Sequence, residues 1–176
     1  MTIHNINNKE KSIVLTGFMG VGKTTVGKLL ANRLNRTFID IDKEIENEYQ
    51  KPITKIFKTI GEKAFRQKEK ETVIHYAKQG GKIISLGGGA FMQKEIKDAC
   101  LENCIVIHLD ISWKAWKERM SMLVEGRPVL QSKSIEDIEA LFSRRRETYL
   151  KSHFTLITDD YSEEEVTENI INKLKL

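Results

Sequence analysis

Residues 17–24 read GFMGVGKT and fit the spacing G-x-x-x-x-G-K-[ST] at every fixed position. In this motif the glycines let backbone N–H groups turn inward around the phosphates of a nucleotide, the lysine reaches the β- and γ-phosphates, and the hydroxyl binds Mg²⁺. An apolar run at residues 12–16 precedes the loop, and a helical pattern begins at Lys23, which is the context that the motif requires. A dinucleotide fingerprint is excluded because Thr25 stands where its third glycine belongs. The sequence therefore predicts a nucleoside triphosphate site, lined by Gly20, Val21, Gly22, Lys23, Thr24 and Thr25.

Arg145 lies on a helix face that is otherwise apolar. At 100° per residue, Ile138, Phe142 and Tyr149 align on one stripe of the helix expected at residues 134–151, and Arg145 falls in the middle of that stripe. A buried charge without a partner is costly, and the chain offers Arg145 no acidic neighbour on this face. We therefore expect its guanidinium to receive an anion. A structural salt bridge to a distant carboxylate is the alternative.

Arg66 repeats this pattern on an earlier helix. In the helical segment from Glu62, Val73 and Ala77 define the inward stripe, and Arg66 and Glu69 share it. An ion pair between Arg66 and Glu69, three residues apart on one helix, is the plain alternative. Two inward arginines in a small nucleotide-binding protein indicate a bidentate site for a substrate carboxylate or phosphate.

The run FIDID at residues 38–42 ends the second expected strand with two aspartates, Asp40 and Asp42. Two residues apart on a strand, their side chains are expected on the same side. One of them could complete a Mg²⁺ shell, and the other could accept hydrogen bonds from a hydroxyl group of the substrate. The alternative is that Asp42 only caps the helix expected to begin at Lys43.

Three consecutive glycines, Gly87, Gly88 and Gly89, follow the third expected strand in the run SLGGGAF. Without side chains, this backbone can approach a ligand closely and present its N–H groups to it. A plain tight turn is the alternative, although such a turn needs only one or two glycines. We expect the triplet to contact the substrate.

The order of the elements predicts an α/β fold with a parallel sheet, because short apolar runs alternate with helix-length segments. In such a sheet, ligands bind beyond the carboxyl ends of the strands, where all the motifs above lie. Strands are expected at residues 12–16, 37–41, 82–86, 104–109 and 154–158, with the first, third and fourth buried on both faces. Helices are expected at residues 23–35, 43–50, 53–80 with a break near Gly61, 92–102, 112–122, 134–151 and 162–175.

Two segments are expected outside this framework. Residues 1–11 are polar and read as an N-terminal tail, whereas residues 123–133 break the helical pattern with Gly126 and Pro128. The second segment is long for a connection between helices, which favours a mobile lid over an inert surface loop. We expect a single domain over residues 1–176.

The composition excludes several classes of protein. With 40% hydrophobic and 31% charged residues the chain is globular, and its net charge of +4 is dispersed, so we expect no nucleic-acid partner. Cys100 and Cys104 suit a reduced compartment and are too few for a disulfide framework. The N-terminus has no apolar segment of the kind that a signal peptide contains, and no stretch could cross a bilayer. We expect a cytoplasmic monomer without a membrane partner.

The motifs follow one another in an order that resembles the shikimate kinase family. The P-loop, FIDID, FRQKE, LGGGAF, GRPVL and RRRETY cover the chain from about residue 12 to residue 158. The resemblance implies a three-layer P-loop kinase fold with a five-stranded parallel sheet ordered 2-3-1-4-5, flanked by helices and carrying a mobile lid. It also implies that ATP and Mg²⁺ are used to phosphorylate the 3-hydroxyl of shikimate, in the route to chorismate and the aromatic amino acids.

The resemblance further implies roles in binding the substrate. Asp42 matches the aspartate that holds the substrate hydroxyls and is the candidate base. Arg66 and Arg145 match the two arginines that clamp the shikimate carboxylate. The glycine triplet matches the turn that contacts the substrate, with Gly88 as the expected direct contact.

Other matches concern the nucleotide. Asp40 matches the partner of Thr24 on the Mg²⁺ side, Arg127 matches the lid arginine that reaches the phosphates, and Arg119 is similar to the arginine beside the adenine. Residues 158–165 are acidic where some members of the family place a basic residue near the adenine. Lys23, Asp42 and Arg127 are therefore the expected catalytic residues.

Three other functions fit part of the pattern. Gluconate is also a polyhydroxy acid, so a carboxylate clamp alone does not separate a gluconate kinase from a shikimate kinase. A nucleoside monophosphate kinase could use two arginines to grip a phosphate. A non-catalytic nucleotide switch would bind ATP without releasing ADP to an acceptor, and the complete set of motif residues speaks against it.

Overall fold

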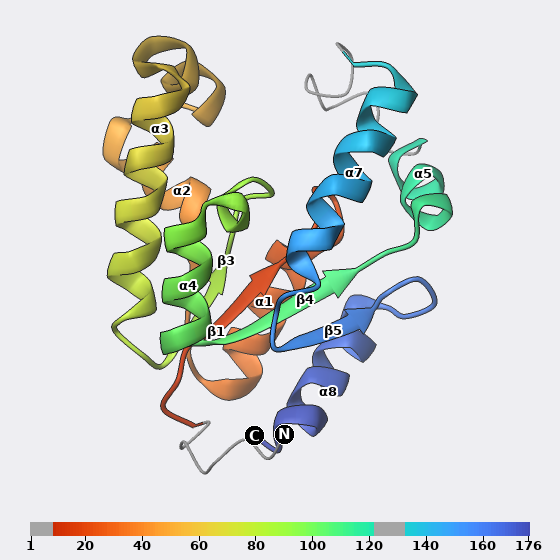
Figure 1. Ribbon diagram of the computed structural model, residues 1–176. Helices are drawn as coiled ribbons and strands as arrows, with labels where there is room; N and C mark the ends of the chain where they lie inside the picture. Colours follow the sequence, from red (N-terminus) through yellow and green to blue (C-terminus); the bar gives the residue numbers. More distant parts are fainter. Residues whose placement is uncertain (1–8, 122–132) are drawn as a thin grey trace.

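The computed structural model of the protein describes residues 9–121 and 133–176 and contains one five-stranded sheet. All of its strand pairs are parallel, and the order β2-β3-β1-β4-β5 is the predicted one (Figure 1). The strands are β1 (Ile13–Thr16), β2 (Thr37–Asp40), β3 (Lys82–Ser85), β4 (Ile105–Asp110) and β5 (Phe154–Ile157). Each lies within a residue or two of its expected position, and the predicted fold class is confirmed.

The three central strands are the buried ones. Every residue of β1 and β4 is buried, as are the last three residues of β3, whereas the edge strands β2 and β5 are partly exposed. In the centre, Val14 pairs with Ile84 on one side and with Val106 on the other. Branched apolar side chains point to both faces of these strands, as a sheet with two covered faces requires.

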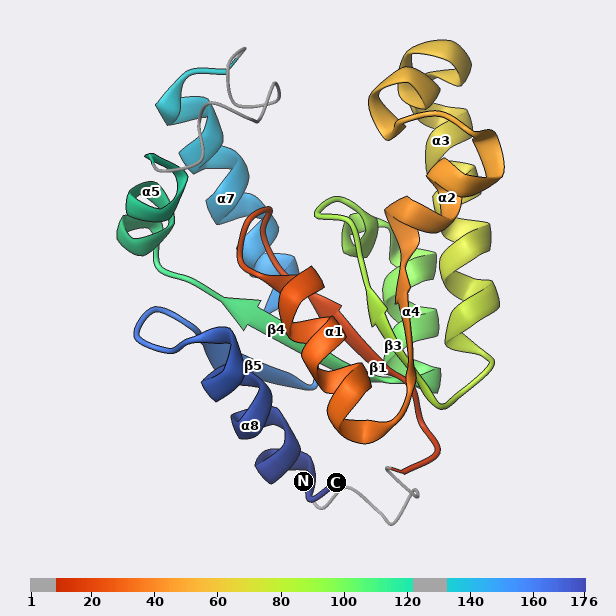
Figure 2. The ribbon, with the colours of Figure 1, turned by 180° about the vertical axis from the view of Figure 1, so that it is seen from behind.

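Helices cover both faces of the sheet. The helices α4 and α7 lie in front of it in Figure 1, and the view from behind in Figure 2 shows α1 and α8 on the opposite face. The bounds are α1 (Lys23–Leu34), α2 (Ile41–Tyr49), α3 (Ile53–Ala77), α4 (Lys94–Asn103), α5 (Trp113–Ser121), α7 (Ile135–Tyr149) and α8 (Glu163–Leu174), with a short 3-10 turn, η1 (Ala90–Met92). Within residues 9–121 and 133–176, no helix is long and apolar enough to cross a membrane.

The longest helix, α3, is interrupted where the sequence predicts a break. Gly61 has φ 82° and ψ 167°, which is outside the helical region and strained for any residue with a side chain. The helix resumes after Gly61 and carries Arg66 and Glu69 toward α2 and α4, against which α3 packs. Of the expected lid, only residue 133 lies within the described residues, and most of the expected N-terminal tail lies outside them.

Candidate active site

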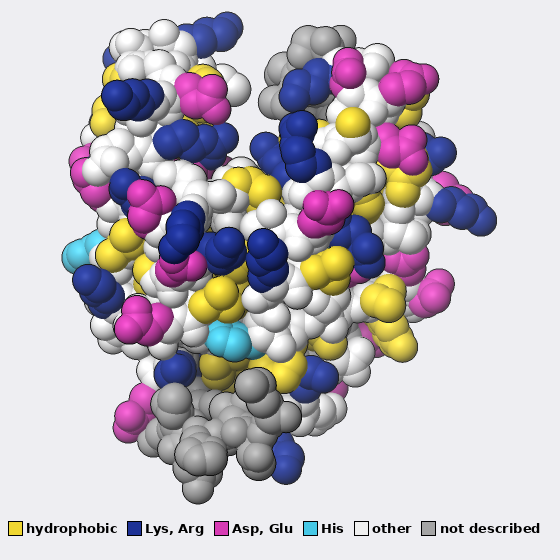
Figure 3. Space-filling model, in the orientation of Figure 1, with side chains coloured by type: hydrophobic (Ala, Val, Ile, Leu, Met, Phe, Trp, Pro, Cys, Tyr) yellow, Lys and Arg dark blue, Asp and Glu magenta, His cyan; other side chains and the backbone are white. Residues whose placement is uncertain are grey.

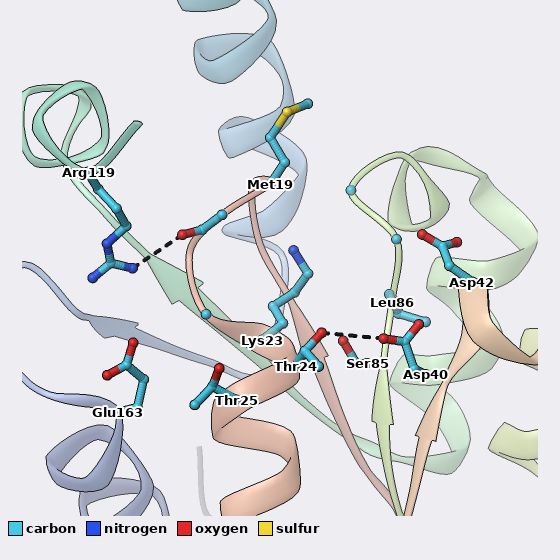
Figure 4. A pocket seen from close by; sticks show the side chains of 14 residues that line it. Met19, Lys23, Thr24, Thr25, Asp40, Asp42, Ser85, Leu86, Arg119 and Glu163 are labelled. Carbon is cyan, nitrogen blue, oxygen red and sulfur yellow. Dashed lines mark hydrogen bonds between the residues drawn. The ribbon is translucent and has the colours of Figure 1, made fainter. Parts of the chain in front are cut away.

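A cavity of about 540 Å³ lies beyond the carboxyl ends of the strands, where the sequence predicts a site. Its walls come from the loop after β1, the end of β2, the loop after β3, the helix α5 and the N-terminus of α8. Figure 3 shows this end of the molecule as a notch between two arms, with Lys and Arg side chains on both of its walls. The close view in Figure 4 places Lys23 and Thr24 between Asp42 on one side and Arg119 and Glu163 on the other.

The loop between β1 and α1 has the geometry of a phosphate cradle. The Lys23 ammonium donates to the carbonyls of Gly17 (2.7 Å) and Phe18 (3.1 Å), so its charge is held inside the loop. Gly17 has φ 147°, and a Cβ at this position would lie 2.5 Å from the carbonyl oxygen of Leu109. Only glycine therefore fits between the loop and β4 at this point. Gly22 is the N-cap of α1 and lines the cavity, so the N-terminus of this helix lies at the cavity, which is favourable for an anion.

Asp40 and Thr24 form an oxygen pair that fits Mg²⁺. The Thr24 hydroxyl donates to Asp40 Oδ2 at 3.3 Å, and both residues line the cavity. Mg²⁺ needs only one or two protein oxygens, because phosphate oxygens and water complete its shell. A hydroxyl and a carboxylate beside a phosphate cradle are the donor set that this ion prefers.

The structure corrects the prediction for the two aspartates. The strand ends at Asp40, which is the N-cap of α2 and accepts from the backbone N–H of Lys43 at 3.2 Å. Asp42 lies in the first turn of α2, so it is not a strand neighbour of Asp40 and does not cap the helix. The sequence-based reading was wrong because the aspartate at the β2–α2 junction ends the strand early. This leaves the Asp42 carboxylate to face the cavity.

The environment of Asp42 opposes its charge. The pKa of Asp42 is raised from 3.8 to about 6, mainly by burial and then by the neighbouring carboxylates of Glu69, Asp40 and Glu46, against the opposing effect of Lys23. A carboxylate with a pKa near neutrality is suited to accept a proton or a hydrogen bond from an alcohol.

The glycine triplet after β3 brings three predicted residues together. A Cβ on Gly87 would lie 3.0 Å from Asp42 Oδ1, and one on Gly89 would lie 2.8 Å from Arg66 Nη2. Between them, a Cβ on Gly88 would lie 3.1 Å from Arg145 Nη1. The three glycines thus face one carboxylate and two guanidinium groups, which come from α2, α3 and α7. No plain turn needs this arrangement, and a side chain here would fill the space between the charged groups.

Arg66 is held by a carboxylate of the protein. Its Nη1 donates to Glu69 Oε1 at 2.8 Å, which is the ion pair that the sequence analysis set as the alternative. The Glu69 side chain is only 2% exposed and also accepts from Gln93 Nε2 at 2.8 Å. Arg66 itself is 29% exposed, and its other nitrogen faces Gly89, so this arginine can bind an acid while Glu69 positions it.

Arg145 is in a different situation. Among the described residues, no carboxylate lies within ion-pair distance of its guanidinium. Burial lowers the pKa of Arg145, the charge of Arg66 contributes in the same direction, and the neighbouring Tyr149 counteracts both. A structural salt bridge, the alternative considered for Arg145, is instead formed by the next residue, Arg146. Arg146 binds Asp110 through Nε (2.9 Å to Oδ1) and Nη2 (2.6 Å to Oδ2).

The far end of the cavity carries charges of both signs. Arg119 Nη1 donates to the carbonyls of Gly20 (3.3 Å) and Val21 (3.2 Å), which places it beside the phosphate loop. Glu163, at the start of α8, also lines the cavity and belongs to the acidic run that the sequence analysis noted. Its position in the cavity was not predicted, because the sequence alone does not say which of three consecutive glutamates faces inward.

With few exceptions, the predicted site residues line this cavity or lie beside it. Val21 is buried and does not line the cavity, although its carbonyl accepts from Arg119, and Arg127 lies outside the described residues. The contribution of Tyr149 was missed, because its side chain was read as part of the apolar stripe. Its hydroxyl donates to the carbonyl of Gly88. The cavity is lined by Gly20, Gly22, Lys23, Thr24, Thr25, Asp40, Asp42, Gly87, Gly88 and Arg119 among the predicted residues, with Arg66, Gly89 and Arg145 beside it.

A phosphate cradle on a parallel sheet of order 2-3-1-4-5, with an aspartate facing the same cavity, is typical of a small-molecule kinase of the P-loop class. Sequence comparison gives the family. The family model for shikimate kinase matches residues 19–175, and the shikimate kinase of Bacillus subtilis (strain 168) is 48% identical over 171 residues, covering 96% of this chain and 91% of its own length. The chain belongs to the shikimate kinase family.

Solved structures agree with this assignment. The shikimate kinase from Acinetobacter baumannii, solved in complex with shikimate, superposes with a TM-score of 0.86 at 29% identity, covering 96% of this chain and 94% of that one. A gluconokinase from Sinorhizobium meliloti 1021 superposes with a TM-score of 0.61 at 16% identity, covering 95% and 93%. The second likeness shows the fold alone, so the gluconate kinase alternative is less well supported.

Proposed function

We propose that this chain transfers the γ-phosphate of ATP to the 3-hydroxyl of shikimate with the residues described above, in the presence of Mg²⁺. The observation that carries the proposal is the glycine triplet, whose three residues face Asp42, Arg145 and Arg66 in turn. This is a site for one molecule that has an acid group at one end and hydroxyl groups at the other. Both features belong to shikimate.

The acid end is held by the two arginines in this proposal. Arg66 and Arg145 come from different helices and approach adjacent glycines, so a carboxylate between them would receive charge-assisted hydrogen bonds from two directions. The Arg145 charge has no carboxylate partner among the described residues, so binding an acid there also supplies the anion that a buried guanidinium needs.

The hydroxyl end faces Asp42. In this proposal its carboxylate accepts the hydrogen of the reacting hydroxyl and holds the oxygen in line with the γ-phosphate. Because the pKa of Asp42 is about 6, the group is ionised near neutral pH and still basic enough to take the proton when the new bond forms. Placement and charge neutralisation carry most of the catalysis in phosphoryl transfer.

The nucleotide runs from this point toward the other end of the cavity. Lys23 offsets charge on the β- and γ-phosphates, and the backbone N–H groups before α1 hold them. Thr24 and Asp40 would hold Mg²⁺, which neutralises phosphate charge when it is bound. In this proposal Arg119 and Thr25 lie on the side of the cavity that binds the nucleoside. Arg127 keeps its proposed role at the phosphates from the family resemblance, and it lies outside the described residues.

ADP release tests the proposal directly. Purified protein with ATP and Mg²⁺ should release ADP when shikimate is added, and far less with gluconate or with no acid. Removal of Mg²⁺ by chelation should stop the reaction. ADP release at the same rate with and without shikimate would contradict the proposal, and a response to gluconate alone would support the alternative.

We also propose that the protein acts as a monomer in the cytoplasm. Every described residue with a proposed role comes from one chain and lines one cavity or lies beside it, so no second copy is needed to complete this part of the site. Light scattering after size exclusion would measure the mass, and full activity in a species of 20.3 kDa would support the monomer.

A further inference from the structure

Tyr149 ends α7 inside the core, one turn after Arg145, and its hydroxyl meets the substrate turn. The side chain is 1% exposed, and the hydroxyl donates to the carbonyl oxygen of Gly88. The same hydroxyl lies 3.8 Å from the position of a Cβ on Gly88, to which Arg145 Nη1 is the closest group at 3.1 Å. One phenol thus contacts the middle glycine of the triplet next to the arginine that faces it.

The hydrogen bond fixes the orientation of a peptide plane. The carbonyl of Gly88 and the N–H of Gly89 belong to one planar trans unit, so they point in opposite directions. A glycine carries no side chain that would hold this unit in place, and consecutive glycines rotate more freely than any other sequence. When Tyr149 holds the carbonyl on its own side, the N–H of Gly89 is presented on the side away from α7.

The ring of Tyr149 packs against a second aromatic side chain. It packs against the ring of His108 with the centroids 5.2 Å apart, and His108 Nε2 lies 3.7 Å from Asp110 Oδ1. Asp110 in turn binds Arg146 through two nitrogens, which anchors α7 to β4 just before the tyrosine. Burial raises the pKa of Tyr149 to about 12, so the hydroxyl keeps its proton and remains a donor at any pH at which the protein works.

We propose that Tyr149 is a positioning residue for acid binding: its hydroxyl fixes the Gly88 peptide and supports Arg145, so that the substrate carboxylate meets a preformed site. The proposal rests on the proposed function of this cavity and adds to it a residue that touches neither the nucleotide nor the reacting hydroxyl. The ring of a phenylalanine would fill this part of the core equally well, so the role proposed here belongs to the hydroxyl of Tyr149.

The test is Tyr149→Phe, which removes one oxygen and keeps the ring. A neutral hydrogen bond of this kind is worth about a two- to tenfold change in an equilibrium constant. We expect the KM for shikimate, and its dissociation constant by calorimetry, to rise by about that factor. The kcat at saturating shikimate and the KM for ATP should stay within about twofold of wild type.

Tyr76→Phe is the matched control. The Tyr76 hydroxyl donates to Glu44 Oε2 at 2.7 Å between α2 and α3, so this variant also loses one hydrogen bond but leaves the glycine triplet untouched. Melting temperatures of both variants measure the purely structural effect. An unchanged shikimate affinity in Tyr149→Phe would overturn the inference, as would an equal loss of affinity in both variants.

The wild-type assay tests the proposed function separately from the role of Tyr149. If wild-type protein fails to phosphorylate shikimate, the proposed function is wrong. If wild type is active and Tyr149→Phe binds shikimate equally well, only the role of Tyr149 is wrong. A fall in kcat and a rise in both KM values together would indicate a general disturbance of the fold and would also overturn the positioning role.

Discussion

The two ends of the cavity are built differently. At the nucleotide end the charged side chains are held by backbone carbonyls of one contiguous loop, as Lys23 is by Gly17 and Phe18 and Arg119 is by Gly20 and Val21. At the acid end the charged groups come from two separate helices, α3 and α7, and are positioned by other side chains, such as Glu69 for Arg66.

This difference separates general from specific recognition. Backbone groups of a glycine-rich loop bind any triphosphate, because phosphates present the same oxygens whatever nucleoside carries them. Side chains that converge from separate helices bind only a molecule whose acid and hydroxyl groups have the matching separation. We therefore expect substitutions at the two ends to change different kinetic constants.

The largest effect is expected from Lys23→Met at the nucleotide end. Loss of a preorganised cation at the transferring phosphate should lower kcat by about 10²–10³-fold. The dissociation constant for shikimate, measured by calorimetry without nucleotide, should stay near the wild-type value. A parallel loss of shikimate affinity would show that the two ends are not separate.

Arg145→Ala should act on the acid end alone. Loss of its charge-assisted hydrogen bonds should raise the KM for shikimate by about 10- to 100-fold. The KM for ATP should not change. Arg144→Ala, a substitution of the exposed neighbour on the same helix, is the control and should behave as wild type. An intact shikimate affinity in Arg145→Ala would remove this residue from the proposed clamp.

Arg66→Ala should lower both affinity and stability, which distinguishes the two arginines of the acid end. The substitution leaves the buried carboxylate of Glu69 with Gln93 as its remaining partner, at a cost of about 2 kcal/mol in the free energy of unfolding. In Arg66→Ala/Glu69→Gln the stability should recover while the shikimate affinity stays low. Chemical denaturation measures the first and calorimetry the second. A double variant as unstable as Arg66→Ala would refute this explanation.

The smallest expected effect is a pH dependence that belongs to Asp42. If its carboxylate must be ionised to orient the hydroxyl, kcat/KM for shikimate should fall about tenfold per pH unit below pH 6. The folded protein binds this proton more tightly than the unfolded chain does, since the pKa is raised from 3.8 to about 6. The contribution of Asp42 to stability is therefore complete below pH 3.8 and is lost as the pH rises through about 6.

Asp42→Asn separates the two parts of this prediction. At pH 8 the variant should unfold at a higher denaturant concentration than wild type, because it removes a charge that burial opposes, and it should be less active than wild type. Equal stability of the two proteins at pH 8 would show that the raised pKa does not describe this group. A wild-type activity that stays constant from pH 7 to pH 5 would contradict the orienting role.

The sequence predicts the nucleotide end better than the acid end. One contiguous motif with a strand before it and a helix after it predicts the phosphate loop. Short apolar runs predict the five strands, and the family resemblance predicts their order in the sheet. The position of Arg145 follows from helical periodicity and from the resemblance, and in the structure its guanidinium faces Gly88. The contacts within the acid end depend on where separate helices meet, which no local pattern contains.

The misplaced aspartate illustrates what local patterns leave out. FIDID continues the alternation of a strand, but Asp40 can cap a helix, and the chain turns at that point. The Asp110–Arg146 pair was missed for another reason, since its two members are 36 residues apart and one of them is buried in a strand. Such a pair becomes visible only when the register of α7 on β4 is known.

That pair has a consequence for its neighbour. Arg145 and Arg146 are adjacent, so on a helix their side chains diverge by about 100°, and clamping the second to β4 sets the direction in which the first projects. Asp110, at the end of β4, therefore fixes the orientation of α7 about its own axis. Inserting a single residue within the helix upstream would turn Arg145 into the direction of the strand, and deleting one would turn Arg146 toward the substrate.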